Sequence, residues 1–215
     1  MLEFCPLCTE KKSNLYSTID DKKYFKCSTC DLIFIDSKYH PTASQEKKQY
    51  DQHQNSYENK GYVAFLNQVC TPIKSYLSKK AKGLDYGCGP GPIIHKIMKE
   101  DGFQTSLYDP IYLNDPNALN QKYDFITCTE VFEHFHHPKQ EISKILNLLK
   151  PGALLGIMTQ LPPKDPDSFS EWWYLRDPTH VCFYNLKTID WLSTQYSLTQ
   201  ISIMPGIYIL KSDYK

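Results

Sequence analysis

Four cysteines near the start of the chain have the spacing of a metal site. They form two doublets, Cys5-Pro-Leu-Cys8 and Cys27-Ser-Thr-Cys30, with 18 residues between them. A two-residue gap lets one tight turn direct two thiolates at one ion, so the pattern predicts a tetrahedral zinc site. Because the protein would fill all four positions, we expect a structural Zn²⁺. Disulfides or a redox-active doublet would need an export signal or a βαβ context, which the sequence does not offer.

A second motif is the loop Gly87-Cys88-Gly89-Pro90-Gly91, which follows the acid Asp85. Glycine lacks a Cβ and adopts positive φ easily, so such a loop between a strand and a helix lets a ligand approach the backbone closely. Asp109 ends the next expected strand, where it can accept hydrogen bonds from a ribose diol. The pattern favours an adenosine-containing ligand over glycines that merely turn the chain.

Two further clusters combine polar and aromatic side chains. Glu130, Glu133 and His134 follow an expected strand, where a histidine serves either as a base or as a hydrogen-bonding residue at a helix start. Residues 171–184 form a long loop interrupted by proline. Long loops in compact domains tend to serve sites, although a hydrophobic lid is the alternative. The expected substrate contacts in this loop are Trp172, Trp173, Arg176, His180 and Tyr184.

The elements that must position these residues alternate between strands and helices. This alternation is typical of a parallel sheet covered on both faces, and a 41% hydrophobic composition suits a packed core. Two late apolar runs, 198–204 and 207–210, are split by Pro205-Gly206 and predict a hairpin that ends the sheet antiparallel. Strands are expected at residues 82–86, 104–108, 123–129 and 153–159, and helices at 61–77, 93–98, 142–149 and 186–195.

The chain divides into three expected parts. Residues 1–40 form a zinc ribbon, in which a hairpin carries one cysteine doublet at each end. Residues 41–80 form a tyrosine-rich connector with an amphipathic helix that includes Pro72. Its tyrosines are expected to form a packing layer, with a substrate-contacting lid as the alternative. Residues 81–215 form the main domain.

The segment Leu84-Asp85-Tyr86-Gly87-Cys88-Gly89-Pro90-Gly91 resembles the first motif of class I S-adenosylmethionine-dependent methyltransferases. Residues 124–134 resemble the fourth-strand motif of that family, and 149–154 resemble the helix-turn-strand that follows it. The resemblance covers about residues 81–215. It implies an α/β, Rossmann-like methyltransferase fold with a seven-stranded sheet whose last strand is antiparallel, here joined to the small N-terminal zinc ribbon.

The resemblance also implies S-adenosyl-L-methionine as the cofactor, with Asp109 as the ribose-binding acid. The implied cofactor-binding residues are Asp85, Gly87, Cys88, Gly89, Gly91, Asp109 and Glu130. The stretch from Asp109 to Tyr123 departs from the family because it is short and offers only 117–119 as a third strand. Asp115 is the substitute for the adenine-contacting acid of many relatives.

Methyl transfer requires chiefly that the acceptor be aligned in line with the donor, and that its proton be removed when the acceptor is a hydroxyl or an amine. The expected catalytic residues are His180, His134 and Glu130. Asp177-Pro178-Thr179-His180 resembles a segment of small-molecule members of the family, which makes His180 the preferred base or substrate contact.

The charge balance bears on the methyl acceptor. With a net charge of +0 and a pI near 7.0, the chain does not attract polyanions over long range. We therefore expect a small-molecule acceptor, such as a metabolite or biosynthetic intermediate. An RNA methyltransferase is one alternative, because a ribosomal RNA methyltransferase family carries a similar ribbon. A partner-binding protein with an inactive methyltransferase fold is another, and a nicotinamide-dependent oxidoreductase is a third.

The expected location is the cytoplasm. The first residues lack the basic-then-apolar layout of a signal peptide, and no apolar run approaches the roughly 18 residues that span a bilayer. No membrane partner is expected.

Overall fold

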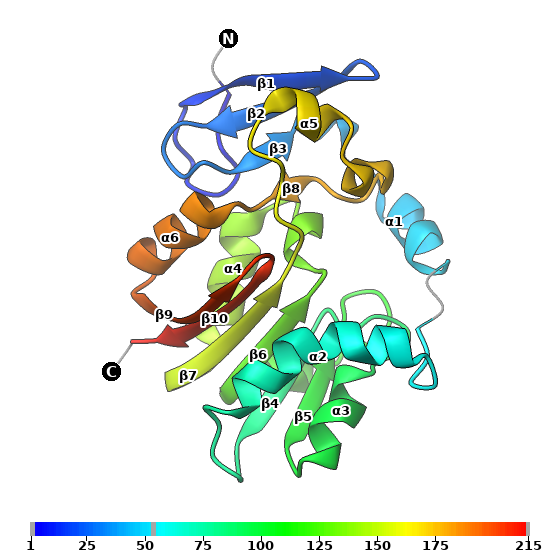
Figure 1. Ribbon diagram of the computed structural model, residues 1–215, viewed down its shortest axis with the longest axis vertical. Coiled ribbons are helices and arrows are strands. Elements are labelled where there is room, and N and C mark those ends of the chain that lie inside the picture. Colours follow the sequence, from blue (N-terminus) through cyan, green and yellow to red (C-terminus); the bar gives the residue numbers. More distant parts are fainter. Residues whose placement is uncertain (1–2, 53–54, 214–215) are drawn as a thin grey trace.

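A six-stranded mixed sheet forms the centre of the computed structural model, which describes residues 3–52 and 55–213 (Figure 1). The strand order is β5-β4-β6-β7-β10-β9, and the first four of these strands are parallel to one another. β10 is antiparallel to both of its neighbours, which confirms the predicted antiparallel end. The strands are β4 (Lys82–Tyr86), β5 (Gln104–Tyr108), β6 (Tyr123–Thr129), β7 (Leu149–Met158), β9 (Leu198–Met204) and β10 (Ile207–Ser212).

The prediction of a seventh strand is wrong. Residues 117–119 lie instead in a 3₁₀ helix, η2 (Pro116–Leu119). The carboxylate of Asp115 accepts a hydrogen bond from the amide of Asn117 at 2.9 Å, which starts the helical turn. Pro116 has no amide hydrogen to donate to a neighbouring strand, so this segment is poorly suited to a sheet.

Helices cover both faces of the sheet. α2 and α3 pack on one face, where Val69, Ile73 and Ile97 contact the same apolar cluster as Phe125. α4 packs on the other face, where Ile142 and Ile145 share a cluster with Ile126. Adjacent residues of β6 thus supply opposite layers, as strand geometry requires. The helices are α1 (Ala43–Tyr50), α2 (Lys60–Lys74), α3 (Ile94–Glu100), α4 (Pro138–Asn147), α5 (Pro166–Ser170) and α6 (Leu186–Gln195).

The cysteine-rich segment forms a second sheet, ordered β1-β2-β3-β8. β1 and β2 pair antiparallel as the predicted hairpin, and β8 is a two-residue strand from the long loop after β7. α5, from the same loop, lies against β1 (Figure 1), and the ring of Phe169 meets those of Tyr16 and Tyr24 edge-on at 5.4 Å. The ribbon is therefore built partly from the C-terminal half of the chain. Its strands are β1 (Ser13–Ile19), β2 (Lys22–Cys27), β3 (Ile33–Ile35) and β8 (Cys182–Phe183).

The helices of the described residues do not include one that is long and apolar enough to cross a membrane.

Replacing Gly83 by alanine is expected to destabilise the sheet. A Cβ at Gly83 would lie 2.1 Å from the ring of Phe125, which is fully buried. Overpacking of this kind costs about 3 kcal/mol of unfolding free energy. Urea unfolding of Gly83→Ala measures the loss. In Gly61→Ala, the matched control in α2, the nearest atom is Asn59 Oδ1 at 3.4 Å, so stability should hold or rise by up to about 1 kcal/mol. Equal stability of the two variants would contradict the packing argument.

Candidate functional site

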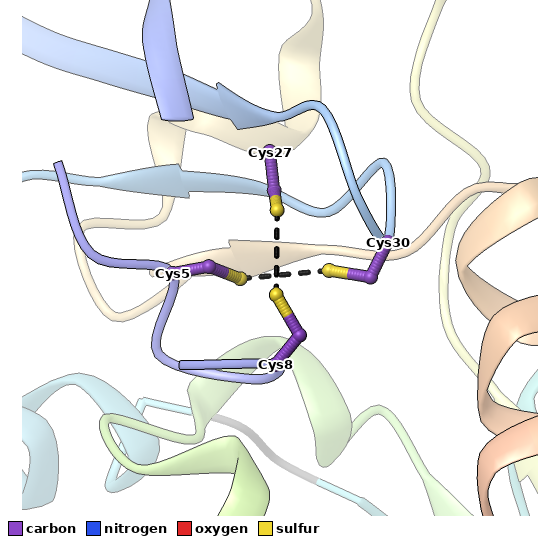
Figure 2. A group of neighbouring side chains, drawn as sticks. All are labelled: Cys5, Cys8, Cys27 and Cys30. Carbon is purple, nitrogen blue, oxygen red and sulfur yellow. Dashed lines mark hydrogen bonds between the residues drawn. The ribbon is translucent and has the colours of Figure 1, made fainter. Parts of the chain in front are cut away.

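The four cysteines of the ribbon meet at one point, with their sulfur atoms directed at a common centre (Figure 2). The Sγ atoms of Cys5 and Cys30 are 3.5 Å apart, and those of Cys8 and Cys27 are 3.4 Å apart. A disulfide would bring two sulfurs to about 2.05 Å, whereas tetrahedral zinc with Zn–S bonds of about 2.3 Å separates them by about 3.8 Å. The arrangement fits the predicted Zn²⁺.

The two halves of this cluster share one local geometry. The amide of Thr9 donates to the carbonyl of Cys5, and the amide of Asp31 donates to that of Cys27. Thr9 and Asp31 both have a φ near +60°, which reverses the chain after each doublet. The repeated turn explains why a two-residue gap aims both thiolates of each doublet inward.

The glycine loop after β4 packs against the sheet at its first glycine and has free space around its second. Gly87 and Gly89 have φ values of +78° and +63°, which favour glycine. The amide of Gly87 donates to the carbonyl of Tyr108 at 2.8 Å, and a Cβ there would collide with Val131. A Cβ at Gly89 would meet nothing within 4 Å. The loop is therefore held against the sheet at Gly87 and leaves room for a ligand at Gly89.

Asp109 fixes this loop from the end of β5. Its Oδ2 accepts the amide hydrogen of Gly89 at 2.9 Å, and its Oδ1 accepts those of Ile111 and Tyr112 at 2.8 and 2.9 Å. A carboxylate offers about four lone-pair sites, so these bonds still leave acceptor capacity for a ribose hydroxyl. Asp109 lies at the cavity wall, where the predicted ribose contact requires it.

Asp85 lies beneath the loop and is almost completely buried. The hydroxyl of Thr127 donates to its Oδ1 at 3.1 Å. Desolvation raises the pKa of Asp85 to about 7, against the opposing effect of the Thr127 hydrogen bond. The carboxyl therefore changes charge near neutral pH, far above its ordinary range.

A cavity of about 970 Å³ lies at the carboxyl ends of the parallel strands and joins the predicted sites. This volume is near the upper end for small-molecule pockets. The cavity is lined by every predicted cofactor-binding and catalytic residue, namely Asp85, Gly87, Cys88, Gly89, Gly91, Asp109, Glu130, His134 and His180. Their exact roles remain predictions.

The predicted substrate contacts separate into two groups. Trp173, Arg176 and His180 line the cavity. Tyr184 is fully buried beside Phe132, and Trp172 packs on the ring of Phe183. Neither of these two side chains lines the cavity, because both fill the space between the long loop and the ribbon. The predicted adenine contact Asp115 also lies outside the cavity lining, where it caps η2.

Two buried carboxyl groups face one tyrosine at the cavity wall, which Glu130 and Tyr174 line. The hydroxyl of Tyr174 lies 3.0 Å from Glu130 Oε2 and also contacts Glu133 Oε1. Desolvation raises the pKa of both acids, and the proximity of Glu133 raises the pKa of Glu130 further. A phenol has a single proton to donate, so this arrangement favours a proton shared within the group. Glu130 also has a φ of +53°, a strained conformation for a non-glycine residue.

His134 and His180 lie against each other, with ring centroids 4.8 Å apart. His134 comes from η3 (Phe132–His134), after β6, and His180 comes from the loop before β8. Nδ1 of His134 lies 3.1 Å from the carbonyl oxygen of Thr179, and Nδ1 of His180 lies 2.7 Å from that of Tyr174. The structure thus unites two histidines that lie 46 positions apart in the chain.

Some lining residues were expected to have another role, or none, in the site. Tyr50 and Tyr62 of the connector line the cavity, so the connector contributes a wall as well as packing. Glu46 of α1 also lines the cavity, one helical turn before Tyr50. The four-residue spacing of these two residues is the only sequence feature that could have placed them on the same face of the helix. No sequence signal indicated that Tyr174 contacts both acids, because this contact joins η4 (Trp173–Arg176) to the turn after β6, which is distant in the chain.

Zinc removal is expected to loosen the ribbon. We expect one Zn²⁺ per chain by elemental analysis, and loss of that zinc in Cys27→Ser together with a lower Tm, because structural zinc contributes directly to folding free energy. Cys70→Ser is the control, since Cys70 is buried in α2 outside the cluster and its replacement should leave the zinc content unchanged. Wild-type zinc content in Cys27→Ser would refute the assignment.

Asp85 should make stability depend on pH. Its folded pKa of about 7 exceeds the ordinary value of 3.8, so between these values the folded state binds more protons than the unfolded state, and stability falls as pH rises. Asp85→Asn should remove the part of this decline that Asp85 causes, while Glu130 and Glu133, whose pKa values burial also raises, keep their own part. The unfolding free energy of the variant should therefore exceed that of the wild type by up to about 4 kcal/mol, with the gain growing between about pH 4 and pH 8.

Urea unfolding across that pH range measures the difference. Asp115→Asn replaces an exposed acid and should track the wild type at each pH. A parallel pH dependence of wild type and Asp85→Asn would show that Asp85 does not carry the effect.

Comparisons with known proteins identify the family. A family model described as a methyltransferase domain matches residues 52–203. The ubiquinone biosynthesis O-methyltransferase of Salmonella typhi is 24% identical over 123 residues, which cover 44% of this chain and 51% of that protein. The Escherichia coli O157:H7 (strain EC4115 / EHEC) protein of the same name is 26% identical over 108 residues, which cover 37% and 45%. The chain thus spans about half the length of the curated relatives it matches.

The fold has a counterpart among solved structures. A methyltransferase of calicheamicin biosynthesis, solved in its SAH-bound form, superposes with a TM-score of 0.50 at 13% identity, covering 74% of this chain and 56% of that one. This likeness concerns the fold alone. The family model spans well over half of the chain and includes the motif from Asp85 to Gly91. The resemblance predicted from that motif is therefore confirmed, and the chain belongs to the methyltransferase domain family.

Proposed function

We propose that this chain is an S-adenosylmethionine-dependent methyltransferase that methylates a small molecule. The observation that carries the proposal is the single cavity that joins the glycine loop and Asp109 to Glu130, His134 and His180. One part of the cavity has the features of an adenosine cradle, and the other has groups that can hold or accept a proton. A methyl donor and an acceptor could therefore meet inside one cavity, which is the main requirement for the reaction.

The charge of the cavity supports a cationic cofactor. Among the described residues, carboxylates outnumber basic side chains in the lining, and S-adenosylmethionine carries a sulfonium and an ammonium group. A phosphate-rich acceptor such as RNA would be repelled by the same carboxylates. The acids that count toward this charge are Glu46, Asp109, Glu141 and Asp177, and the basic residues are Lys144 and Arg176. Asp85 and Glu130 also line the cavity, but burial raises the pKa of each, so they add little negative charge near neutral pH.

The acceptor side of the cavity suits removal of a proton from a hydroxyl group. The cofactor supplies the methyl group and its leaving group, so the chain must align the acceptor and take its proton. His180 and His134 lie at the wall, and Trp173 and Arg176 beside them can hold the acceptor. The names of the curated relatives, O-methyltransferases of ubiquinone biosynthesis, support an oxygen acceptor.

Cofactor binding is the first test. Titration calorimetry of the zinc-loaded protein should give saturable heat with S-adenosylmethionine and with S-adenosylhomocysteine. Asp109→Ala should weaken both by at least tenfold, because it removes the acid expected to bind the ribose and the acceptor that holds Gly89. Asp115→Ala is the matched control, since Asp115 lies outside the cavity lining, and should bind as the wild type does. No heat with either compound would overturn the proposal.

The acceptor class is tested by transfer of a labelled methyl group. Label should enter a small-molecule extract and should not enter total RNA when both are incubated with the protein. The reverse result would identify an RNA methyltransferase. Cofactor binding without transfer to either fraction would contradict the proposed reaction and favour a binding role.

A further inference from the structure

Three potential metal ligands converge beside the cavity, in a group that shares no residue with the four cysteines. The ligand atoms of Glu133, His134 and His180 all lie within 4.8 Å of one another. Glu133 and His134 come from the turn after β6, and His180 comes from the loop before β8. Two imidazoles and one carboxylate are the ligand set of the facial triad that holds divalent transition metals.

The backbone sets the protonation of both rings. A carbonyl oxygen can only accept a hydrogen bond, so the contacts of Nδ1 with the carbonyls of Thr179 and Tyr174 require a proton on each Nδ1. In the neutral imidazole, Nε2 then carries the lone pair. Histidines that bind metals are usually fixed in this way, with the second nitrogen donating to a carbonyl or carboxylate.

The carboxylate of the triad offers an independent indication. Glu133 is completely buried, and its Oε2 has no hydrogen-bond partner among the described residues, while Oε1 is engaged by Tyr174. An unpartnered carboxylate oxygen is costly to bury, and buried charges are normally paired or bound to metal. A cation at this point would satisfy Oε2.

The spacing and charge of the site suit such an ion. Nε2 of His134 lies 3.9 Å from Glu133 Oε1, whereas two ligands about 2.1 Å from one ion lie roughly 3 to 3.5 Å apart. A relative movement of about an ångström or less would bring this pair of atoms to the spacing of two ligands on one ion. Asp177, whose Oδ2 is 4.0 Å from Nε2 of His180, adds negative charge beside it. Arg176, which precedes Asp177 in the sequence, is a basic residue that lines the same cavity.

From this geometry we infer that Glu133, His134 and His180 form a binding site for one divalent transition-metal ion, separate from the four-cysteine site. The ion would lie where the two histidines meet the cavity, so it can also bind an oxygen of a small molecule held there. That second role rests on the proposed function, whereas metal binding itself does not. With the ion bound, the two imidazoles act as ligands and do not take the proton of the acceptor.

Cobalt binding tests the site in the full-length, zinc-loaded chain. Addition of Co²⁺ should give one saturable equivalent by calorimetry and weak visible bands, without the strong near-ultraviolet bands that thiolate ligands would produce. The absence of thiolate bands shows that zinc has not been displaced from the cysteines. Glu133→Gln and His180→Asn should each weaken Co²⁺ binding by at least tenfold, because each removes one of three ligands.

His95→Gln is the matched control, because His95 also directs Nδ1 at a backbone carbonyl, that of Thr105 at 2.9 Å, but lies outside the triad. It should bind Co²⁺ as the wild type does. Circular dichroism establishes that each variant is folded, and His134→Gln replaces any variant that is not. Absence of a second metal equivalent in the wild type, or equal binding by the triad variants, would overturn the inference.

Calorimetry with S-adenosylhomocysteine on the same samples separates this inference from the proposed function. Cobalt binding without cofactor binding would leave the metal site standing and remove the methyltransferase proposal. Cofactor binding without cobalt binding would rule out the metal site and leave the methyltransferase proposal in place.

Discussion

Two backbone hydrogen bonds at Val181 hold the ribbon, the long loop and the turn after β6 together. The amide of Val181 donates to the carbonyl of Glu133 at 2.8 Å, and its carbonyl accepts from the amide of Ile35 at 3.0 Å. His180 precedes Val181 directly, so its position depends on both contacts. Zinc at the four cysteines would fix the ribbon, and through it β8 and the loop before β8 that carries this histidine.

The site concentrates unfavourable features that the rest of the molecule must offset. Asp85, Glu130 and Glu133 are carboxyl groups removed from water, and burial raises the pKa of each. Glu130 also adopts a left-handed backbone conformation. Backbone strain and acids with shifted pKa values cluster at functional sites, and they persist only where the surrounding structure is stable enough to hold them in place. Here two apolar layers, one on each face of the sheet, provide that support.

The proposed cofactor side and the proposed acceptor side of the cavity are built differently. The cofactor side consists of β4, the glycine loop and the end of β5, all within about 30 residues of one another. The acceptor side combines α1, the turn after β6 and the loop before β8, which are far apart in the chain. Because the first part is local, it forms a compact motif that relatives can share, while the second part is free to vary with the acceptor.

Local patterns in the sequence were enough to predict the cysteine cluster, the glycine loop and the strands from β4 to β7, because turn geometry and strand periodicity act over a few residues. The missing strand at Pro116 and the burial of Tyr184 were not predicted, since neighbouring elements decide whether a short segment pairs or packs. β8 is only two residues long and carries no periodic signal. Its pairing with the ribbon, and with it the meeting of His134 and His180, arises only when distant segments fold against each other.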